Sequence, residues 1–313
     1  MKLQSMVSAS HWKGCKVLIT GATGFLGRHL VAGAAETGAV VITTSRSETT
    51  TGAAGHVAID LCDRDRVSAM LREVAPSGIL HTAVAGASEE VGFAELMRTN
   101  VAGTENLLAA AVALPQPPAV VLAGSGYEYA PQSRDLTEED PICPITPYGI
   151  SKAAAAFCAG IYATRMPITL LRIFNVYGPG EREPRLLPYA AACAKAGRVM
   201  ELTDCEQVRD FVFVKDVAAL FWRALECSPQ DRRLRVLNVG SGSPAPLKRF
   251  VTVALEVLRE KGLRPQAKFG VRPYRAGEPM YYAGDISRLR ETLGTLPDTS
   301  FQAGIRQTLD LML

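Results

Sequence analysis

A short glycine-rich segment, VLITGATGFLG at residues 17–27, constrains the fold more than any other part of this sequence. Its first residues form an apolar run, as in a buried parallel strand, and residues 28–32 that follow have a helical pattern. Gly21, Gly24 and Gly27 have separate uses: one turns the chain off the strand, one admits a close ligand, and one lets helix and strand pack tightly. Free N–H groups at a helix start bind phosphate, so the segment predicts a pyrophosphate site. An ordinary glycine-rich turn is the alternative.

Strands and helices alternate along the rest of the chain. Of the 313 residues, 48% are apolar, which is enough for a substantial core. Apolar runs that predict further strands lie at residues 39–44, 56–61, 78–85, 119–123, 168–173 and 236–240. This alternation is typical of a Rossmann-type, doubly wound parallel sheet of about seven strands. The pattern becomes less regular from Asn175 onward, and we expect a smaller C-terminal α/β substrate domain there. The predicted division is a dinucleotide-binding domain at 13–178, with 209–242 returning to it, and a substrate domain at 179–208 and 243–313.

Composition excludes several classes of partner. The formal net charge of +3 is too small to indicate nucleic acid or an anionic membrane surface. The seven cysteines are odd in number, irregularly spaced and without a C-x-x-C pair, which fits reduced cytoplasmic thiols better than disulfides or a metal site. The N-terminus lacks the apolar region of a secretory signal, and no apolar run reaches membrane-spanning length. We therefore expect a cytoplasmic protein with no metal, in which residues 1–12 are a loose leader.

The residues after the second predicted strand bear on the form of a dinucleotide cofactor. Ser45, Arg46 and Ser47 follow the run at 39–44. This strand tip meets the adenosine ribose in such folds, where an acidic residue binds both hydroxyls and repels a 2′-phosphate. Hydroxyls and an arginine suit a 2′-phosphate instead, through charge-assisted hydrogen bonds. We therefore expect NADP (NADPH), with NAD as the alternative, in which case Arg46 is only a solvated loop charge.

Other strand ends carry further candidates for cofactor contacts. Asp60 ends the third predicted strand and could accept a hydrogen bond from the adenine amino group, or could cap the helix predicted at 64–74. The small residues after His81 leave room for a flat ring, whereas His81 itself is expected to be packed. Asn100 lies inside a helix predicted at 93–113. We expect it to have a structural role, and a role in the site is the alternative.

Tyr148, Lys152 and Ser125 are the candidate catalytic residues. The tyrosine and the lysine are four residues apart at a predicted helix start, so both project from one face. An ammonium close to a phenol lowers its pKa from about 10, and Tyr148 could then exchange a proton with a hydroxyl or carbonyl oxygen. Ser125, at the tip of the fifth predicted strand, could bind the same oxygen. The alternative is a helix-start tyrosine beside a solvated lysine.

With these motifs in place, the chain resembles the extended short-chain dehydrogenase/reductase family, also described as NAD-dependent epimerases/dehydratases, many of which modify nucleotide-linked sugars. The resemblance runs from about Lys16 to the C-terminus. The motifs that carry it are GATGFLG at 21–27, Asp60, HTA at 81–83, NVAGT at 100–104, Ser125, Y-x-x-x-K at 148–152, LRIFNVYGP at 171–179, RDFVFVKDV at 209–217, NVGSG at 238–242 and RAGE at 275–278.

The resemblance implies a hydride that passes between the nicotinamide C4 and a sugar carbon. It implies that Ser125 and Tyr148 bind the reacting oxygen and that Lys152 binds the nicotinamide ribose. The substrate contacts that we expect are Ser125, Gly126, Tyr127, Asn175, Arg209 and Arg275, with the last three on a nucleotide diphosphate. Either arginine could instead be a surface charge or part of a structural ion pair. The dinucleotide contacts that we expect are Gly21, Thr23, Gly24, Phe25, Leu26, Gly27, Ser45, Arg46, Asp60, Leu61, Thr82, Ala83, Val84, Asn100, Tyr148 and Lys152.

Several reactions of this family remain open. A 4,6-dehydratase usually carries Asp-Glu directly after its catalytic serine or threonine, but Gly126 and Tyr127 stand here, and Glu128 is one residue further on. A 4-epimerase keeps its NAD bound and gains little from a 2′-phosphate pocket. The Ser125-Gly126 pair resembles the residues at the corresponding positions of reductases that act on nucleotide-linked 4-keto-6-deoxysugars. We therefore favour an NADP-dependent ketoreductase of a nucleotide-linked keto-deoxysugar. The alternatives are a 4-epimerase, a dehydratase, a reductase of a non-sugar ketone, and a non-catalytic dinucleotide sensor.

Relatives commonly dimerise through a four-helix bundle, and the resemblance implies a homodimer that pairs helices 93–113 and 148–163. The alanines at 153–156 would permit close helix approach. Their alternative role is to pack on the sheet of their own chain.

Overall fold

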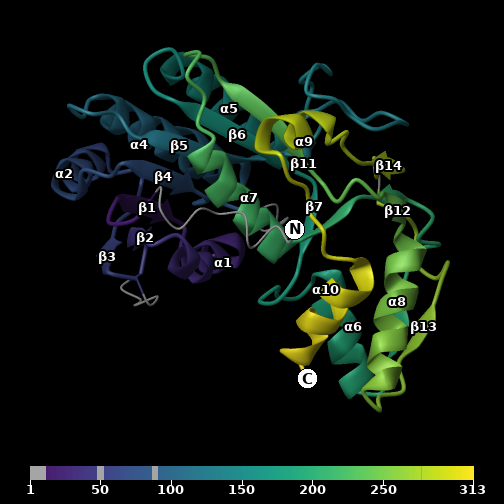
Figure 1. The fold of residues 1–313 in the computed structure, drawn as a ribbon. Coiled ribbons are helices and arrows are strands. Elements are labelled where there is room, and N and C mark those ends of the chain that lie inside the picture. The colour runs from purple at the N-terminus through teal and green to yellow at the C-terminus, as the bar shows by residue number, and fades with distance from the viewer. Residues whose placement is uncertain (1–11, 48–52, 87–90, 276) are drawn as a thin grey trace.

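A seven-stranded parallel sheet forms the centre of the molecule (Figure 1). The computed structural model describes residues 12–47, 53–86, 91–275 and 277–313 of the protein. In spatial order the strands are β3 (Gly55–Ala58), β2 (Val40–Ser45), β1 (Lys16–Thr20), β4 (Gly78–His81), β5 (Ala119–Ser125), β6 (Ile168–Ile173) and β11 (Arg235–Val239). The predicted doubly wound sheet of about seven strands is confirmed.

The strand order reverses beside β1, which pairs with both β2 and β4. Its last residue, Thr20, lies opposite Thr44 on one side and His81 on the other. Ligands of open parallel sheets bind in the crevice outside such a reversal, so this edge is where the site is expected. The third strand is shorter than the sequence predicted. It ends at Ala58 because its partner β2 ends opposite it at Ser45, and Asp60 therefore lies in a loop.

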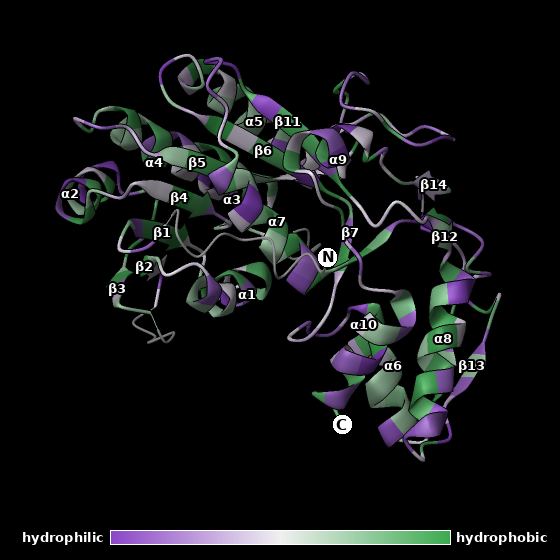
Figure 2. Ribbon diagram, viewed as in Figure 1, coloured by the Kyte–Doolittle hydropathy of each residue, from purple (hydrophilic) through white to green (hydrophobic). Residues whose placement is uncertain are grey.

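Helices cover both faces of the sheet. One face carries α1 (Phe25–Gly33), the turn η2 (Ala34–Glu36), α7 (Val214–Glu226) and α9 (Ser287–Leu293). The other face carries α2 (Arg64–Val74), α3 (Phe93–Leu96), the π-helical turn η3 (Met97–Ala102), α4 (Gly103–Val112) and α5 (Pro147–Tyr162). Figure 2 shows hydrophobic residues along the central strands, where the two apolar cores meet the sheet.

Trp12 corrects one expectation about the N-terminus. We expected residues 1–12 to be a loose leader, but Trp12 is 5% exposed and its ring packs against Gly78 in the core beneath α7. Burying an indole of this size stabilises the fold, so Trp12 is part of the core. Residues 1–11 lie outside the described part of the chain.

A second, smaller unit lies beside the sheet and has its own apolar core (Figure 1). Its helices are α6 (Leu186–Lys195), α8 (Leu247–Glu260) and α10 (Phe301–Asp310), and its two-stranded sheet pairs β8 (Val199–Glu201) with β13 (Gln266–Lys268). Short strands connect this unit to the main sheet: β7 (Asn175–Tyr177) with β10 (Phe211–Phe213), and β9 (Val208–Arg209) with β12 (Ala245–Pro246) and β14 (Tyr281–Tyr282). The chain thus passes between the two parts several times. Helix α9 packs on the main sheet although it falls within 243–313.

In the part of the chain that the structure describes, none of the helices has the length and apolar character needed to cross a bilayer.

Candidate active site

The glycine turn after β1 is closely packed. Gly21 has a φ of +68°, and a Cβ there would lie 2.6 Å from the backbone nitrogen of Ala83. A Cβ on Gly27 would lie 2.1 Å from the carbonyl oxygen of Gly21. Both positions therefore require glycine, one for its conformation and both for close approach of backbone. Gly24 is the N-cap of α1 and makes no side-chain capping bond, which leaves N–H groups of this helix start to face a ligand. This cradle suits a pyrophosphate.

The other predicted residues of this turn lie at its surface. Gly24 is exposed, and Thr23, Phe25 and Leu26 are half-buried. Leu26 also packs against the core of its sheet face, so it supports the turn from behind.

At the tip of β2, Ser45 is less free to bind a ligand than the sequence indicated. The Ser45 hydroxyl donates to the Ser47 carbonyl oxygen at 2.7 Å, so it is already engaged. Arg46 is exposed, and its charge is among those that lower the pKa of Glu95, after the hydrogen bonds from Arg98 and Thr99. Ser45 and Arg46 were both predicted to meet a 2′-phosphate. Of the two, Arg46 is the residue whose side chain is exposed and could reach a ligand.

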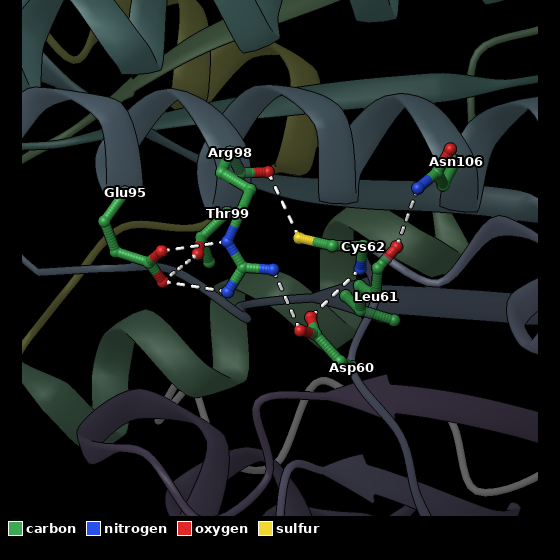
Figure 3. A network of polar contacts seen from close by, with 7 residues as sticks. All are labelled: Asp60, Leu61, Cys62, Glu95, Arg98, Thr99 and Asn106. Atoms are coloured by element: carbon green, nitrogen blue, oxygen red, sulfur yellow. Dashed lines mark hydrogen bonds and ion pairs between the residues drawn. The ribbon is translucent and has the colours of Figure 1, made fainter.

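A network of polar contacts links the loop after β3 to η3 (Figure 3). Asp60 accepts a hydrogen bond from the Cys62 N–H at 3.0 Å and pairs with Arg98 at 3.0 Å. These contacts lower the pKa of Asp60, the Cys62 bond most strongly. Arg98 also pairs with Glu95, at 2.9 Å. Helix α2 is instead capped by Asp63, which accepts from the Arg66 N–H, so the capping role considered for Asp60 is wrong.

Leu61 and the residues after β4 line the same edge. The Leu61 side chain is buried between α2 and α4, and its carbonyl oxygen accepts from Asn106 at 3.0 Å (Figure 3). The Thr82 hydroxyl donates to the Thr20 carbonyl oxygen at 2.8 Å, and Ala83 lies against Gly21. Val84 is 40% exposed, an apolar side chain open to solvent at the end of this edge.

Asn100 is fully engaged by the protein itself. Its Oδ1 accepts from the Ala85 N–H at 2.7 Å, and its Nδ2 donates to the Ser151 hydroxyl at 2.9 Å and to the Ala85 carbonyl oxygen at 3.2 Å. It stands in η3, a π-turn that interrupts the helix predicted at 93–113. These contacts favour the structural interpretation: Asn100 ties the exit of β4 to α5, next to Lys152. Turns of this type are frequent near functional sites.

Ser125, Tyr148 and Lys152 meet at the end of β5. Ser125 is the last residue of that strand and is 5% exposed, and Tyr148 lies in the first turn of α5. A hydrogen bond from Ser125 is one of the effects that act on the pKa of Tyr148. Lys152 is buried, and its Nζ donates to the Ala123 carbonyl oxygen. Ser125 and Tyr148, from separate segments of the sequence, are thus neighbours, and Lys152 reaches the same strand through Ala123.

The ionisation of Tyr148 differs from our expectation. We expected Lys152 to lower the pKa of the phenol, but burial, followed by the charge of Glu128, raises it to about 12. Arg185 is the main cationic influence in the other direction, while Lys152 turns to Ala123. Burial also lowers the pKa of Lys152, to about 8. At neutral pH Tyr148 therefore carries its proton and can donate it.

His81 is packed, as expected. It is 5% exposed; its Nδ1 lies 2.7 Å from the Thr20 hydroxyl and its Nε2 lies 2.9 Å from the Thr104 hydroxyl. Because Thr104 donates to the Asn100 carbonyl oxygen, its own oxygen accepts from Nε2–H, which defines a neutral tautomer. Burial, and then the charge of Lys152, lowers the pKa of His81 to about 3.

Aromatic side chains form a wall beside Ser125. Tyr127 stacks on Tyr282 with ring centroids 4.6 Å apart and meets Tyr148 edge-on at 6.4 Å. Phe174 tilts against Tyr282 at 4.9 Å. A Cβ on Gly126 would lie 2.6 Å from the Tyr282 hydroxyl, so only glycine leaves room for the Tyr282 side chain beside this turn. Sequence reasoning missed Tyr282, because β14 is a two-residue strand with no periodic signal.

Arginines gather on the same side. The charges of Arg209, Arg185 and Arg275 all act to lower the pKa of Tyr127, which burial raises. Arg209 is buried and already paired with Glu278. Of the predicted diphosphate ligands, Asn175 donates to the Asp210 carbonyl oxygen at 3.4 Å. Arg185, the N-cap residue of α6, was not predicted, since no motif marks it.

The seven cysteines, all within the described ranges, are free thiols. Among the residues that the structure describes, no cluster of three His, Cys, Asp or Glu side chains could hold a metal ion.

Known proteins resemble this chain over nearly its whole length. The model of the "NAD dependent epimerase/dehydratase family" matches residues 17–240. A dTDP-6-deoxy-L-talose 4-dehydrogenase (NAD(P)(+)) from Kitasatospora kifunensis is 29% identical, over 96% of this chain and 96% of its own length. A dTDP-glucose 4,6-dehydratase from Neisseria gonorrhoeae is 28% identical, over 82% of this chain and 80% of its own. The structure of MoeE5 in complex with UDP-glucuronic acid and NAD has a TM-score of 0.82 and 30% identity, covering 95% of this chain and 98% of that one.

Proposed function

The chain belongs to the NAD dependent epimerase/dehydratase family, and from this premise we propose that it reduces a keto group on a nucleotide-linked deoxysugar with NADPH. One observation carries the choice of reaction. Tyr148 holds its proton beside Ser125, whereas Glu128, the carboxylate of the turn after Ser125, has both oxygens engaged by Ser125 and Arg172. This geometry supplies one proton donor to a carbonyl oxygen. It does not offer Glu128 as the second acid or base that elimination of water needs.

The residues present fit a dinucleotide. The cradle of Gly21 and Gly27 at the uncapped start of α1 suits the pyrophosphate, and Lys152 suits the nicotinamide ribose. When bound, NADPH would supply the hydride. The protein would bind the substrate carbonyl oxygen through Ser125 and Tyr148, and the Tyr148 phenol would give that oxygen its proton. The aromatic wall and the arginines around Tyr127 would hold the sugar and its diphosphate.

The two parts of the fold would divide these tasks. We propose that the sheet region, 13–178 with 209–242, binds the dinucleotide, and that 179–208 and 243–313 bind the sugar nucleotide. Tyr282 and Arg185 would belong to the second group through β14 and α6. Helix α9 falls within 243–313 but packs on the sheet, so it would connect the two parts.

Assays with a panel of nucleotide-linked keto-sugars test this function. We expect NADPH oxidation with at least one 4-keto-6-deoxysugar. A 4-epimerase with bound NAD is the second candidate, favoured by the MoeE5 structure, whose complex contains NAD and UDP-glucuronic acid. Retention of NAD(H) through purification, together with interconversion of sugars without net NADPH oxidation, would favour the epimerase.

Arg46 should set the preference for NADPH over NADH. Because a charge-assisted hydrogen bond contributes about 1.5–3 kcal/mol, Arg46→Asp should lower the ratio of kcat/KM for NADPH to that for NADH by about 10- to 100-fold. Steady-state kinetics with both cofactors measure this ratio. Arg72→Asp, an exposed arginine near the end of α2, is the matched control and should leave it unchanged. An unaltered ratio in Arg46→Asp would rule out this 2′-phosphate pocket.

The outer face of α5 fits a second copy of the chain. The alanines that we considered for this contact mostly pack inward, because Ala153, Ala155 and Ala156 are buried within their own chain. The face that remains open carries Phe157 and Ile161, which are 65% and 70% exposed. Two exposed side chains of this size, one helical turn apart, form an apolar stripe that a helix pair can bury. We propose that this stripe forms the centre of a homodimer.

Phe157→Glu should convert the dimer into a monomer, because it would bury an unpaired charge on each side of a two-fold contact. Light scattering after size-exclusion chromatography measures the mass. Val271→Glu, at another exposed apolar residue, is the control and should stay dimeric. A monomeric wild-type protein, or a dimeric Phe157→Glu variant, would exclude this face.

A further inference from the structure

A buried ion pair lies directly behind the turn that carries Ser125. Glu128 is fully buried and Arg172 is 6% exposed. Glu128 Oε2 lies 2.7 Å from Arg172 Nε, and its Oε1 accepts the backbone N–H of Ser125 at 2.8 Å. The Arg172 guanidinium also lies over the Tyr129 ring, 4.5 Å from its centroid. The pair thus joins the tips of β5 and β6 at the position of Ser125.

Local sequence makes room for this arrangement. Gly124 stands opposite Arg172 in the sheet, and a Cβ there would lie 2.9 Å from Glu128 Oε1. Residues 126–128 form a short 3-10 turn, η4 (Gly126–Glu128), in which Ser125 Oγ accepts the Tyr127 N–H at 3.2 Å. The carboxylate therefore reaches back to the start of its own turn and fixes the backbone of Ser125.

The charge of Glu128 acts on both candidate proton-carrying groups. It raises the pKa of Tyr148, second only to burial, and it opposes the effect of burial on the pKa of Lys152. The other groups that face Tyr148 are Tyr127 from η4, Tyr282 from β14, Arg185 from the start of α6, and Ser125. Those that face Lys152 include the neutral His81 on β4. The desolvation cost of two buried charges often offsets their attraction, so this pair is not explained by net stability alone.

We propose that Glu128, held by Arg172, is a positioning residue of the active site: it fixes Ser125 and keeps a negative charge near Tyr148 and Lys152. This inference rests on the proposed function, in which Tyr148 donates a proton to the carbonyl oxygen bound by Ser125. Glu128 and Arg172 themselves would not touch the substrate. Their effect would reach the reaction through the placement of Ser125 and through the protonation of the phenol and the amine.

The double variant Glu128→Gln with Arg172→Met tests the proposal, because it removes both charges and leaves neither buried alone. We expect it to fold, to bind NADPH at pH 6, where Lys152 stays charged, within twofold of the wild-type dissociation constant, and to lose at least tenfold in kcat. The alkaline limb of its kcat–pH profile should lie at lower pH, since Glu128 no longer favours the protonated forms. Asp216→Asn is the matched control: Asp216 is also buried and accepts two hydrogen bonds, from Thr299, but outside the site. Its kcat and pH profile should stay as in the wild type.

A wild-type kcat and pH profile in the double variant would overturn the proposal. If the double variant does not fold, Arg172→Lys decides, because it keeps both charges but loses the Nε donor: kcat should fall severalfold at unchanged NADPH affinity, and an unchanged kcat would overturn the proposal. Failure of the proposed function looks different, because the wild type would then oxidise no NADPH with any keto-sugar. In that case the double variant and Arg172→Lys are assayed for interconversion of nucleotide sugars. The alkaline limb of the kcat–pH profile of the double variant must again lie at lower pH than that of the wild type, or the proposal is overturned.

Discussion

Replacement of Tyr148 by Phe should lower kcat for NADPH-dependent reduction by about 10²- to 10⁴-fold, the usual contribution of a positioned proton donor. The phenol is protonated at neutral pH, because burial and Glu128 raise its pKa to about 12. In the proposed reaction, its removal would leave Ser125 to bind the carbonyl oxygen without a group that protonates it. NADPH affinity should change little, since the cradle around Gly21 and Gly27 is untouched. Stopped-flow measurement of NADPH oxidation and a fluorescence titration separate the two quantities.

Tyr162→Phe is the matched control for this variant. Tyr162 lies at the end of the same helix, and its hydroxyl donates to Glu105 at 2.6 Å, outside the site. It should keep the wild-type kcat. Turnover in Tyr148→Phe comparable to that of Tyr162→Phe would remove Tyr148 from the mechanism.

The pH profile of the wild type should reflect Lys152. Because burial lowers the pKa of this amine to about 8, it is largely charged at neutral pH and loses its proton as the pH rises through 8. A neutral amine binds the ribose hydroxyls less well, so we expect kcat/KM for NADPH to be level below pH 7 and to fall above pH 8. A profile that is level up to pH 10 would contradict the proposed role of the lysine.

Gly27→Ala should have the second large effect, on folding and cofactor binding together. The new Cβ would lie 2.1 Å from the Gly21 carbonyl oxygen and 2.8 Å from the Ala22 Cα, and both are backbone atoms that cannot rotate away. Strain from overpacking costs about 3 kcal/mol where the surroundings cannot relax. We expect a loss of about that size in the free energy of unfolding by urea, and at least a tenfold weaker affinity for NADPH.

Gly33→Ala is the control on the same helix. Its Cβ would meet the Trp222 ring at 3.5 Å, an ordinary contact, and Gly33 has a helical φ. This variant should gain up to about 1 kcal/mol, because alanine loses less conformational freedom than glycine on folding. Equal stability of the two variants would show that the turn after β1 tolerates a side chain and is not the tight cradle described above.

Local patterns predicted the parts of the fold that depend on neighbours in sequence. The apolar run before Gly21 forms β1, the run at 168–173 forms β6 with those bounds, and Tyr148 and Lys152 lie on one helix. Spacing alone is enough for such features, because the periods of strands and helices are set by the backbone. The helix predicted at 93–113 was less regular than its pattern, since Asn100 contacts Ala85 and Ser151 from within a π-turn.

Features that depend on distant partners could not be predicted in this way. Glu128 and Arg172 are 44 residues apart, and the stack of Tyr127 on Tyr282 joins the turn η4 to the distant strand β14. The pKa of Tyr148 also depends on burial and on Arg185, neither of which follows from its spacing to Lys152. The cap of α2 was missed although a local signal existed: Asp63 directly precedes the helix predicted at 64–74, which is the N-cap position, whereas Asp60 lies three residues earlier.

The most direct test is to incubate the purified enzyme with NADPH and a nucleotide-linked 4-keto-6-deoxysugar and to follow both compounds together. We predict that NADPH is oxidised in a one-to-one ratio with loss of the keto-sugar, and that a hydride labelled at the nicotinamide C4 appears on the sugar carbon. Interconversion of sugars with no net oxidation of NADPH, and with NAD retained by the protein, would contradict the proposed reduction.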